Sequence, residues 1–304
     1  MYKYKRILIG LDLTEMDGVL LKYSRELVKR LSAEKIYFLH IAENFDIPKD
    51  IKEKYPDLLA PKDESIEAIC KEQIDEFWQH IDDLETAIEV REGNAFNTLL
   101  KFSDQKDIDL VIMGRKKSLK GSGVLPQKVI NLMHSSVLLV PEDITFKLDK
   151  IVAPIDFSKH SELTVEQVIN LSENSETSIQ FIHVYTVPSG YHKAGKSYDE
   201  FAEIMKNHAR ADYKAFLTKM DIQESHSCDY VLDDDHRPAD KIFNYAEKEN
   251  ADLIVMGSKG RTGLASILLG SVAAKVVSYD TQIPLLVVKE KKENMGFLKA
   301  LLNI

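Results

Sequence analysis

The sequence has few cysteines, no excess of positive charge and no long apolar stretch, and each absence excludes a class of protein. Cys70 and Cys228 lie far apart and match no metal or redox spacing, which favours a reducing compartment. Lys and Arg number 40 against 49 Asp and Glu, a net charge of −9, so a basic face for nucleic acid is not expected. Uncharged stretches such as 262–274 contain glycines and are too short for a membrane span.

The amino terminus also lacks the features of an export signal. The apolar run Ile7–Leu11 follows several basic residues but stops at Asp12, which is too early for a signal-peptide core. We therefore expect a cytoplasmic protein without nucleic-acid or membrane partners.

The residues that are present supply ample material for a folded core. The chain has 304 residues, of which 44% are hydrophobic and 29% charged. These proportions are typical of globular proteins and unlike those of disordered or collagen-like chains. Since the length is about twice that of a usual domain, two domains are expected.

Four segments of the first half recur in the second half in the same order. The pairs are Ile7–Thr14 with Ile151–Ser158, Ile36–Ile41 with Ile179–Val184, Asp109–Gly114 with Asp252–Gly257, and Val137–Val140 with Leu285–Val288. The difference in residue number between the paired segments grows clearly only at the last pair. The second copy therefore carries extra residues in the loop after Gly257. Such repetition predicts two copies of one folding unit.

Each copy alternates short apolar runs with helical patterns. The runs are rich in Ile, Val and Leu, as expected for parallel strands covered on both faces. Thr14 and Ser158 precede the first helix of each copy and are expected to cap it. Apolar residues at three- and four-residue spacing predict the helices: Leu20, Tyr23, Leu27 and Leu31; Ile66, Ile69, Cys70, Phe77 and Ile81; Val165, Val168 and Ile169; Phe201, Met205 and His208; Ile242, Tyr245 and Ala246. The alternation predicts two tandem doubly wound α/β domains with parallel sheets.

We expect the domains at residues 1–143 and 147–290, followed by a C-terminal tail at 291–304. The connection near 141–147 is too short to let the domains move apart freely. Because the apolar last strand of each copy would leave an exposed edge, we expect these two strands to join the halves into a pseudo-dimer. The tail has charged and then apolar residues and is expected to dock on its own protein, with partner binding as the alternative.

The candidate binding site lies in the second copy, beyond the carboxyl ends of its strands. Ligands of open parallel sheets bind at that edge, where the strand order reverses. Three predicted strands end there, at Pro154-Ile155-Asp156, at His183-Val184 and at Met256-Gly257. The third strand runs into a glycine-rich loop, residues 257–271, which suits a backbone cradle for an anion.

Each feature of that loop favours phosphate. Gly257, Gly260 and Gly270 allow positive φ and close backbone approach. Ser271 opens a helix whose first N–H groups favour an anion. The loop lacks the Gly-Lys-Ser/Thr ending of a P-loop, and it follows the fourth strand rather than the first, unlike the dinucleotide fingerprint. A ligand with several phosphates is expected to need Mg²⁺, because Lys259 and few other basic groups face its charge.

The pattern G-x2-G-x9-G-S after Val-Met-Gly resembles the nucleotide-binding signature of the universal stress protein family, and the resemblance spans nearly the whole chain twice. It implies a Rossmann-like, adenine nucleotide alpha hydrolase-like fold that binds ATP. By this resemblance Asp156 and Val184 contact the adenosine end, while the glycines and Ser271 hold the triphosphate. The full candidate set is Pro154, Ile155, Asp156, Val184, Met256, Gly257, Lys259, Gly260, Arg261, Gly270, Ser271 and Val272.

The first copy departs from this signature. Gly114 is kept, but Lys117 stands where the second copy has Gly260, and the shorter loop puts Val124 where the second copy has Ser271. A side chain at Lys117 and a contracted loop narrow the phosphate seat, although neighbouring lysines still attract an anion. We therefore expect one competent nucleotide site, in the second domain.

Other polar residues have simpler interpretations. Asp12 and Asp156 stand at strand ends in both copies and could merely cap turns, although a binding role is favoured for Asp156. His40 and His183 are expected to be partly buried and hydrogen-bonded to the backbone. The acidic stretch 233–237 is interpreted as a solvated loop rather than a cation site. A zinc site built from distant histidines has no support in the spacing.

Three functions are compatible with these patterns. The first is a stress-response protein that binds an adenine nucleotide and acts as a nucleotide-dependent regulator or interaction module. The second is a slow ATPase, against which stands the lack of a recognisable general base and nucleophile beside the loop. The third is an ATP-independent scaffold for unknown protein partners. The sequence leaves open whether two chains form a homodimer.

Overall fold

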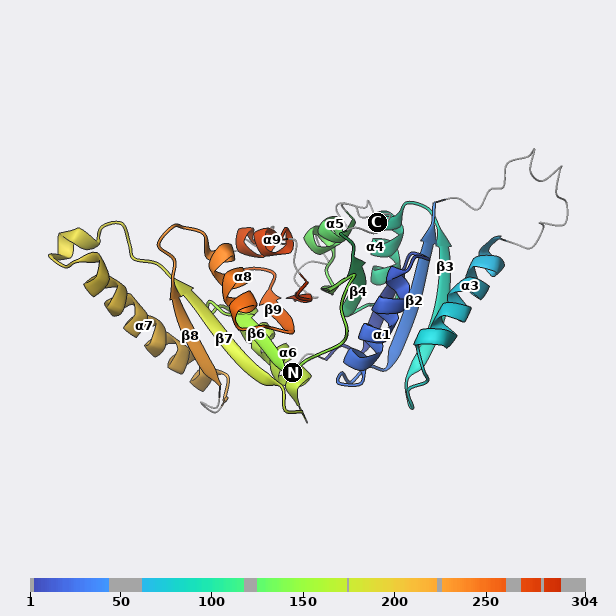
Figure 1. Cartoon of the computed structure of the whole chain (residues 1–304), viewed down its shortest axis with the longest axis horizontal. Coiled ribbons are helices and arrows are strands. Elements are labelled where there is room, and N and C mark those ends of the chain that lie inside the picture. Colours follow the sequence, from blue (N-terminus) through green and yellow to red (C-terminus); the bar gives the residue numbers. More distant parts are fainter. Residues whose placement is uncertain are drawn as a thin grey trace. The chain divides into compact units, whose positions relative to one another are not determined.

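The chain folds into two compact units of the same architecture, one from Lys3 to Phe146 and one starting at Lys147. Figure 1 shows the computed structural model, coloured along the sequence. The structure describes residues 3–43, 62–117, 125–173, 175–222, 226–260, 269–279 and 282–290. The expected tail at 291–304 lies outside the described residues, and the pseudo-dimer stays a prediction.

The N-terminal unit alternates strands and helices. Its strands pair in parallel in the order β3-β2-β1-β4-β5. The elements are β1 (Arg6–Leu11), α1 (Met16–Val28), β2 (Lys35–Ala42), α3 (Lys62–Phe77), β3 (Glu85–Glu92), α4 (Ala95–Gln105), β4 (Leu110–Arg115), α5 (Leu125–Leu132) and β5 (Ser136–Pro141).

The C-terminal unit repeats this order. Its strands pair in parallel as β8-β7-β6-β9-β10. The elements are β6 (Lys150–Pro154), α6 (Lys159–Ser172), β7 (Ser178–Tyr185), the 3₁₀ turn η1 (Tyr191–Ala194), α7 (Tyr198–Lys219), β8 (Ser227–Leu232), α8 (Pro238–Lys248), β9 (Leu253–Gly257), α9 (Ser271–Val277) and β10 (Leu285–Val288).

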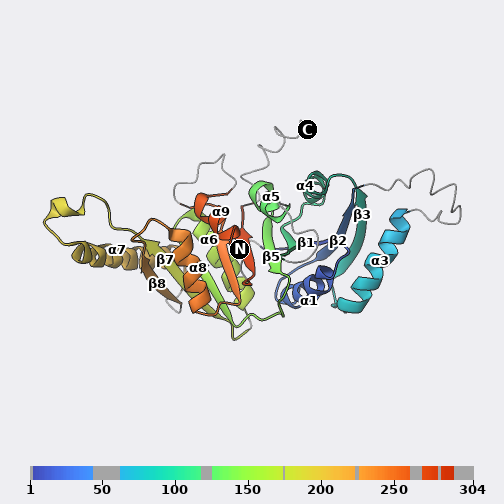
Figure 2. The same ribbon diagram turned by 45° about the horizontal axis from the view of Figure 1, so that its top comes forward.

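Both units are doubly wound, which confirms the predicted α/β class. In the C-terminal unit α6 packs on β6 and β9, α7 lies along β7 and β8, and α8 packs against α9 (Figures 1 and 2). Since helices cover the sheet, its central strands are buried and almost entirely apolar, including Val152, Ile254 and Val287. The strand order reverses between β6 and β9, where a ligand crevice is expected.

The helix starts agree in part with the sequence prediction. Ser158 caps α6 by accepting a hydrogen bond from the Ser161 N–H, as predicted. Thr14 is not the cap of α1, which begins after Glu15, although its hydroxyl accepts a 3.4 Å hydrogen bond from the Met16 N–H. The turn before α1 is instead held by the Asp17 carboxylate, which accepts from the Asp12 and Leu13 N–H groups.

Two residues of the predicted apolar stripes, Ile69 and His208, are exposed. Ile69 on α3 is 46% exposed, whereas its neighbour Cys70 is buried. On α7 His208 is exposed, because the helix buries the next residue along, Ala209, with Ala202, Tyr213, Phe216 and Leu217. The buried face of α7 thus begins with two alanines and continues with residues nearer the C-terminal end of the helix. The three- and four-residue spacing of Phe201, Met205 and His208 therefore predicted the wrong face.

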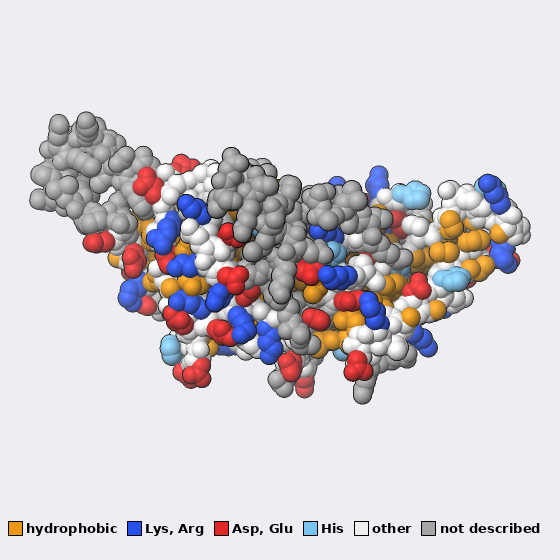
Figure 3. All heavy atoms as spheres, turned by 180° about the vertical axis from the view of Figure 1, so that it is seen from behind, with side chains coloured by type: hydrophobic (Ala, Val, Ile, Leu, Met, Phe, Trp, Pro, Cys, Tyr) orange, Lys and Arg blue, Asp and Glu red, His pale blue; other side chains and the backbone are white. Residues whose placement is uncertain are grey.

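The surface of the described residues mixes charges of both signs. On the face shown in Figure 3 the Lys and Arg side chains are interspersed with Asp and Glu rather than gathered into one basic field. In the described part of the chain, every helix is too short or too polar to cross a bilayer.

Candidate functional site

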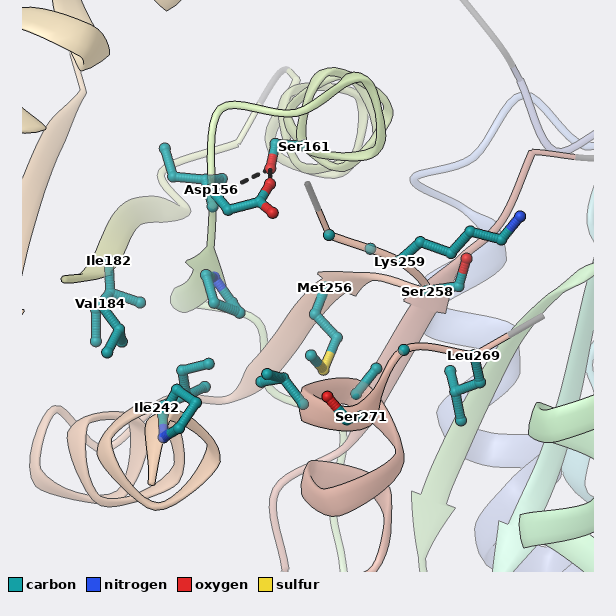
Figure 4. A pocket seen from close by; sticks show the side chains of 18 residues that line it. Asp156, Ser161, Ile182, Val184, Ile242, Met256, Ser258, Lys259, Leu269 and Ser271 are labelled. Carbon is teal, nitrogen blue, oxygen red and sulfur yellow. Dashed lines mark hydrogen bonds between the residues drawn. The ribbon is translucent and has the colours of Figure 1, made fainter. Parts of the chain in front are cut away.

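A cavity of about 710 Å³ opens in the C-terminal unit beyond the carboxyl ends of β6, β7 and β9 (Figure 4). It therefore lies where the strand order reverses, as the topology predicts. The lining residues are Pro154, Ile155, Asp156, Ser161, Ile182, Val184, Pro238, Ile242, Met256, Gly257, Ser258, Lys259, Gly260, Leu269, Gly270, Ser271, Val272 and Ala273.

One end of this cavity is apolar. Figure 4 shows Ile182 and Val184 from β7 together with Ile242 from α8 on one side of the opening. Ile155, which follows β6, also lines the cavity and is buried. Aliphatic side chains of this kind suit a flat hydrophobic group such as a purine ring.

The other end is built from backbone. The Gly270 N–H donates to the Ser258 carbonyl at 2.7 Å, and the Ser258 N–H donates to the Val288 carbonyl at 2.9 Å. The first bond ties the start of α9 to the residue after β9, and the second ties that residue to the end of β10, so both described ends of the loop are held. Arg261 lies outside the described residues.

Gly260 in this loop is needed for space rather than for φ. The described glycines with positive φ are Gly93 and Gly195, and Gly270 has φ −71°, so the expected left-handed conformations are wrong. A Cβ on Gly260 would stand 2.7 Å from the Asp156 Oδ2 atom. Since side chains essentially never approach so closely, glycine at 260 lets the loop backbone lie directly against this carboxylate.

Asp156 is held in place by a compact set of hydrogen bonds. Its Oδ1 atom accepts from the Ser161 hydroxyl at 2.7 Å and from the Ser158 N–H at 3.1 Å, while its own N–H donates to the Ser161 Oγ at 2.9 Å. Asp156 thus closes the turn before α6, as the capping interpretation suggested. The same carboxylate also lines the cavity through Oδ2, so capping and ligand binding are compatible.

The residue after Asp156 has a strained backbone that an aromatic contact supports. Phe157 has φ 65°, a conformation unusual for a bulky side chain. Its ring stacks on His183 with centroids 4.3 Å apart. His183 Nδ1 lies 2.8 Å from the Ile155 carbonyl oxygen, and His40 Nδ1 lies 3.1 Å from that of Leu11 in the other unit. The predicted backbone-bonded histidines are confirmed in both units.

Replacing Ser161 by alanine should loosen this turn. The change removes the acceptor of the Asp156 N–H and one donor to its carboxylate, and unmade buried hydrogen bonds cost about 1–3 kcal/mol. We expect amide hydrogen exchange in β6 and the start of α6 to quicken by about tenfold or more, as measured by mass spectrometry. Ser278→Ala, on the exposed surface after α9, should leave these segments at the wild-type rate. Equal rates in the two variants would contradict this account of Ser161.

The equivalent place in the N-terminal unit is arranged differently. Lys116 has a 6% exposed side chain that forms an ion pair with Asp12, the counterpart of Asp156. Asp17 stands in the place of Ser161, and its buried carboxylate accepts from the Asp12 and Leu13 N–H groups. Burial raises the pKa of Asp17 to about 6, helped by the nearby Asp12 charge and opposed by these hydrogen bonds and by Lys116.

The loop after β4 is also bound internally. The Lys117 N–H, at the position of Gly260, donates to the Glu142 carboxylate at 2.9 Å. The Met16 side chain lies against Gly114, where an added Cβ would stand 2.6 Å from the Met16 Cγ atom. By contrast, Figure 4 shows the Lys259 side chain of the C-terminal unit pointing away from Asp156. Val124 lies outside the described residues.

All the predicted site residues that the structure describes line the same cavity. Sequence reasoning missed Ser161, Ile182, Pro238, Ile242, Ser258, Leu269 and Ala273. Ile182 could have been found by two-residue alternation with Val184 on β7. Ser161 could have been found from its counterpart Asp17, since a polar residue recurs five positions after each strand-end aspartate. Pro238 and Ile242 carry no such signal, because only the packing of α8 brings them to this edge.

The remaining polar residues form no metal site in the described ranges, where no group of three or more His, Cys, Asp or Glu side chains could hold an ion. The acidic stretch after β8 is only partly solvated, contrary to expectation. Asp233 is 3% exposed, and its carboxylate accepts a 2.8 Å hydrogen bond from the Arg237 N–H. This aspartate orders the loop instead of facing water.

The fold and the cavity together define a class of protein. The chain is a tandem doubly wound α/β protein with a glycine-lined cavity where the strand order of its second unit reverses. The universal stress protein family model matches residues 3–141 and again residues 147–289. Universal stress protein MJ0531 of Methanocaldococcus jannaschii is 35% identical over 145 residues, which cover 47% of this chain and 84% of the relative. MJ0577 of the same organism is 31% identical over 156 residues, covering 47% and 95%.

Solved structures match both halves at once. A universal stress protein from Archaeoglobus fulgidus has a TM-score of 0.58 at 17% identity, covering 96% of this chain and 98% of that one. The functionally unknown protein PA1789 from Pseudomonas aeruginosa has a TM-score of 0.64 at 15% identity, covering 99% and 97%. At such low identity this likeness shows the fold alone. The chain belongs to the universal stress protein family and carries the family's domain twice.

Proposed function

We propose that the C-terminal unit, residues 147–290, binds ATP or a related adenine nucleotide in the cavity at the ends of β6, β7 and β9. The observation that carries the proposal is the close approach of Gly260 to Asp156 inside a cavity with an apolar end and a glycine-lined end. Its volume of about 710 Å³ suits a small organic ligand. The apolar end would receive the base, and the backbone N–H groups near Gly260 and Gly270 would receive phosphates.

The proposed residues divide the work between the two ends of the ligand. Asp156, Ile155 and Val184 would face the nucleoside, with the Val184 backbone reading the adenine edge. Gly257, Gly260, Gly270 and Ser271 would hold the phosphates. Asp156 is the one carboxylate among the described lining residues. Because Asp156 is assigned to the nucleoside, Mg²⁺ would be held by the phosphates and water rather than by a lining carboxylate.

We propose a single nucleotide site per chain, with residues 1–143 as a domain that has lost the site. The internal bonds of Lys116 to Asp12 and of Lys117 to Glu142 support this asymmetry. In the N-terminal unit a lysine already neutralises the aspartate, and a second carboxylate, that of Asp17, lies buried beside it. Asp17 thus adds a negative charge where the C-terminal unit has the uncharged Ser161, and this charge opposes the approach of phosphate.

The proposed role is nucleotide-dependent regulation of partner binding rather than turnover. Pro154, Met256, Lys259 and Val272 would complete the site, and Arg261 is proposed from the sequence alone. The described lining residues hold no histidine, cysteine or second carboxylate that could form a general base and nucleophile pair with Asp156. Location in the cytoplasm, partner identity and homodimer formation stay predictions.

Calorimetric titration of the whole chain with ATP and Mg²⁺ tests the proposal. We expect one ATP bound per chain and phosphate release no faster than the buffer blank on the timescale of binding. Lys116→Ala, which removes the cation that pairs with Asp12, should leave this stoichiometry unchanged. An absence of binding, or two equal sites per chain, would contradict the proposal. Fast phosphate release that disappears in Asp156→Ala would favour the ATPase instead.

A further inference from the structure

A second cavity of about 510 Å³ adjoins the first in the C-terminal unit. It shares the lining residues Pro238, Ser271 and Val272 with the larger cavity, so the two meet where α8 and α9 begin. Its other lining residues are His236, Arg237, Ala239, Asp240 and Lys275. We call this second cavity the side cavity.

The side cavity is bordered by a loop that is longer than its counterpart in the N-terminal unit. Residues 233–237 join β8 to α8, whereas residues 93–94 join β3 to α4. The two residues directly before α8 are His236 and Arg237, which line the side cavity, whereas Gly93 and Asn94 precede α4. The N-terminal unit therefore has no counterpart of this basic pair among its described residues between β3 and α4.

The acidic side chains of the longer loop are engaged with other groups. The buried Asp233 carboxylate accepts from the Arg237 N–H, and Lys241 Nζ lies 2.6 Å from Asp234 and 3.4 Å from Asp235. These bonds anchor the loop to the first turns of α8. Asp234 and Asp235 thus share the Lys241 ammonium group, and neither this lysine nor Asp233, Asp234 or Asp235 lines the side cavity.

Basic groups prevail on the wall of the side cavity. Arg237 has a 70% exposed side chain and lies 3.7 Å from Asp240, the one acidic lining residue. Asp240 also accepts a hydrogen bond from the Tyr279 hydroxyl. Lys275 Nζ lies 5.3 Å from the centre of the Tyr279 ring. Arg237 and Lys275 thus present two cationic side chains against one carboxylate that already has a donor.

The position of the side cavity indicates which part of a ligand it would meet. In Figure 4 Val184 and Ile242 lie on one side of the large cavity and Ser258 and Lys259 on the other, with Ser271 between them. A nucleotide with its base against Val184 and Ile242 and its 5′-phosphates near Gly260 and Ser271 would therefore place its sugar between these two ends, beside Pro238 and Val272. Pro238 and Val272 also line the side cavity, so a group on the sugar hydroxyls would point into it.

We propose that the side cavity binds a phosphate carried on the sugar, so that the site prefers adenine nucleotides with a 2′- or 3′-phosphate besides the 5′-phosphate. This inference rests on the proposed nucleotide site and extends it. Arg237 supplies a planar pair of donors and Lys275 a mobile ammonium group, the two side chains that most often bind phosphate. His236 adds a ring nitrogen at the same wall.

Competition binding against a fluorescent ATP analogue tests this preference on the full chain. The probes are AMP, adenosine 2′,5′-bisphosphate and adenosine 3′,5′-bisphosphate, each compared with ATP. We expect one of the two bisphosphates to bind about tenfold or more tightly than AMP, since each charge-assisted hydrogen bond contributes about that factor. The bisphosphate that binds more tightly identifies which sugar hydroxyl, 2′ or 3′, faces the side cavity.

The double variant Arg237→Gln, Lys275→Gln should lose this preference while binding AMP as the wild type does. Lys248→Gln, an exposed change in the last turn of α8, should keep it. Binding of ATP with equal affinities for AMP and both bisphosphates would overturn the side-cavity proposal and leave the nucleotide site standing. A preference that survives in the double variant would overturn it as well. Failure of every nucleotide to bind would overturn both proposals.

Discussion

Replacing Gly260 by alanine should weaken ATP binding by about 100-fold, because the new methyl group would stand 2.7 Å from the Asp156 Oδ2 atom. To make room, either the carboxylate must leave the Ser161 hydroxyl and the Ser158 N–H or the loop must move outward. Either movement displaces a group that would contact ATP, the Asp156 carboxylate or the loop backbone. A loss of about 2–3 kcal/mol of binding free energy corresponds to the 100-fold factor. Calorimetric titration with ATP measures the effect.

Gly190→Ala is the matched control for this prediction. Gly190 lies in the same unit before η1, and a Cβ added there would meet nothing within 4 Å. Its variant should bind ATP as the wild type does and unfold at the same temperature. Wild-type affinity in Gly260→Ala would show that the loop and Asp156 need not approach closely, which would remove the main support for the site.

The sequence was sufficient to predict the fold because the evidence for it is distributed along the chain. Eight of the ten described strands coincide with the four repeated segments and are short apolar runs, whereas β3 and β8 are of mixed polarity. An error at one helix therefore does not change the class. The helix faces were less predictable: Ala202 and Ala209 contribute little hydrophobic signal, yet they set the buried side of α7.

The candidate site was predictable where it consists of backbone and strand ends. Glycine at 257, 260 and 270 is a visible signal, although the reason at 260 proved to be space beside Asp156 and none of the three has a left-handed φ. What the sequence could not supply was contact between distant elements. Pro238 and Ile242 reach the cavity through the packing of α8, and the Asp12–Lys116 ion pair joins residues more than a hundred positions apart.

The two units differ most sharply at one pair of equivalent positions, Asp17 and Ser161. Both side chains accept a hydrogen bond from the N–H of the strand-end aspartate. Serine does so without charge, whereas the Asp17 carboxylate is 1% exposed and lies near Asp12. Because its burial is not fully compensated, the ionised form of Asp17 costs free energy in the folded N-terminal unit.

This difference predicts that Asp17 makes the N-terminal unit less stable as the pH rises. Its folded-state pKa of about 6 lies above the ordinary value of 3.8, so the folded protein binds the proton more tightly. The contribution to the free energy of unfolding is therefore fully present below about pH 3.8 and is lost as the pH rises through about 6. At 1.36 kcal/mol per pKa unit the loss is about 3 kcal/mol.

Urea unfolding followed by the fluorescence of Trp78, the single tryptophan, reports on this unit directly. Trp78 is buried against Phe38 in the N-terminal unit, with ring centroids 5.0 Å apart. Between pH 4 and pH 7 the stability of the wild type should fall by about 2.5 kcal/mol relative to Asp17→Ser, which carries the side chain of the other unit. Asp104→Ser, exposed on α4, should follow the wild-type curve. Parallel curves for the wild type and Asp17→Ser would mean that the buried carboxylate is fully compensated, and the proposed electrostatic barrier to phosphate in this unit would lose its basis.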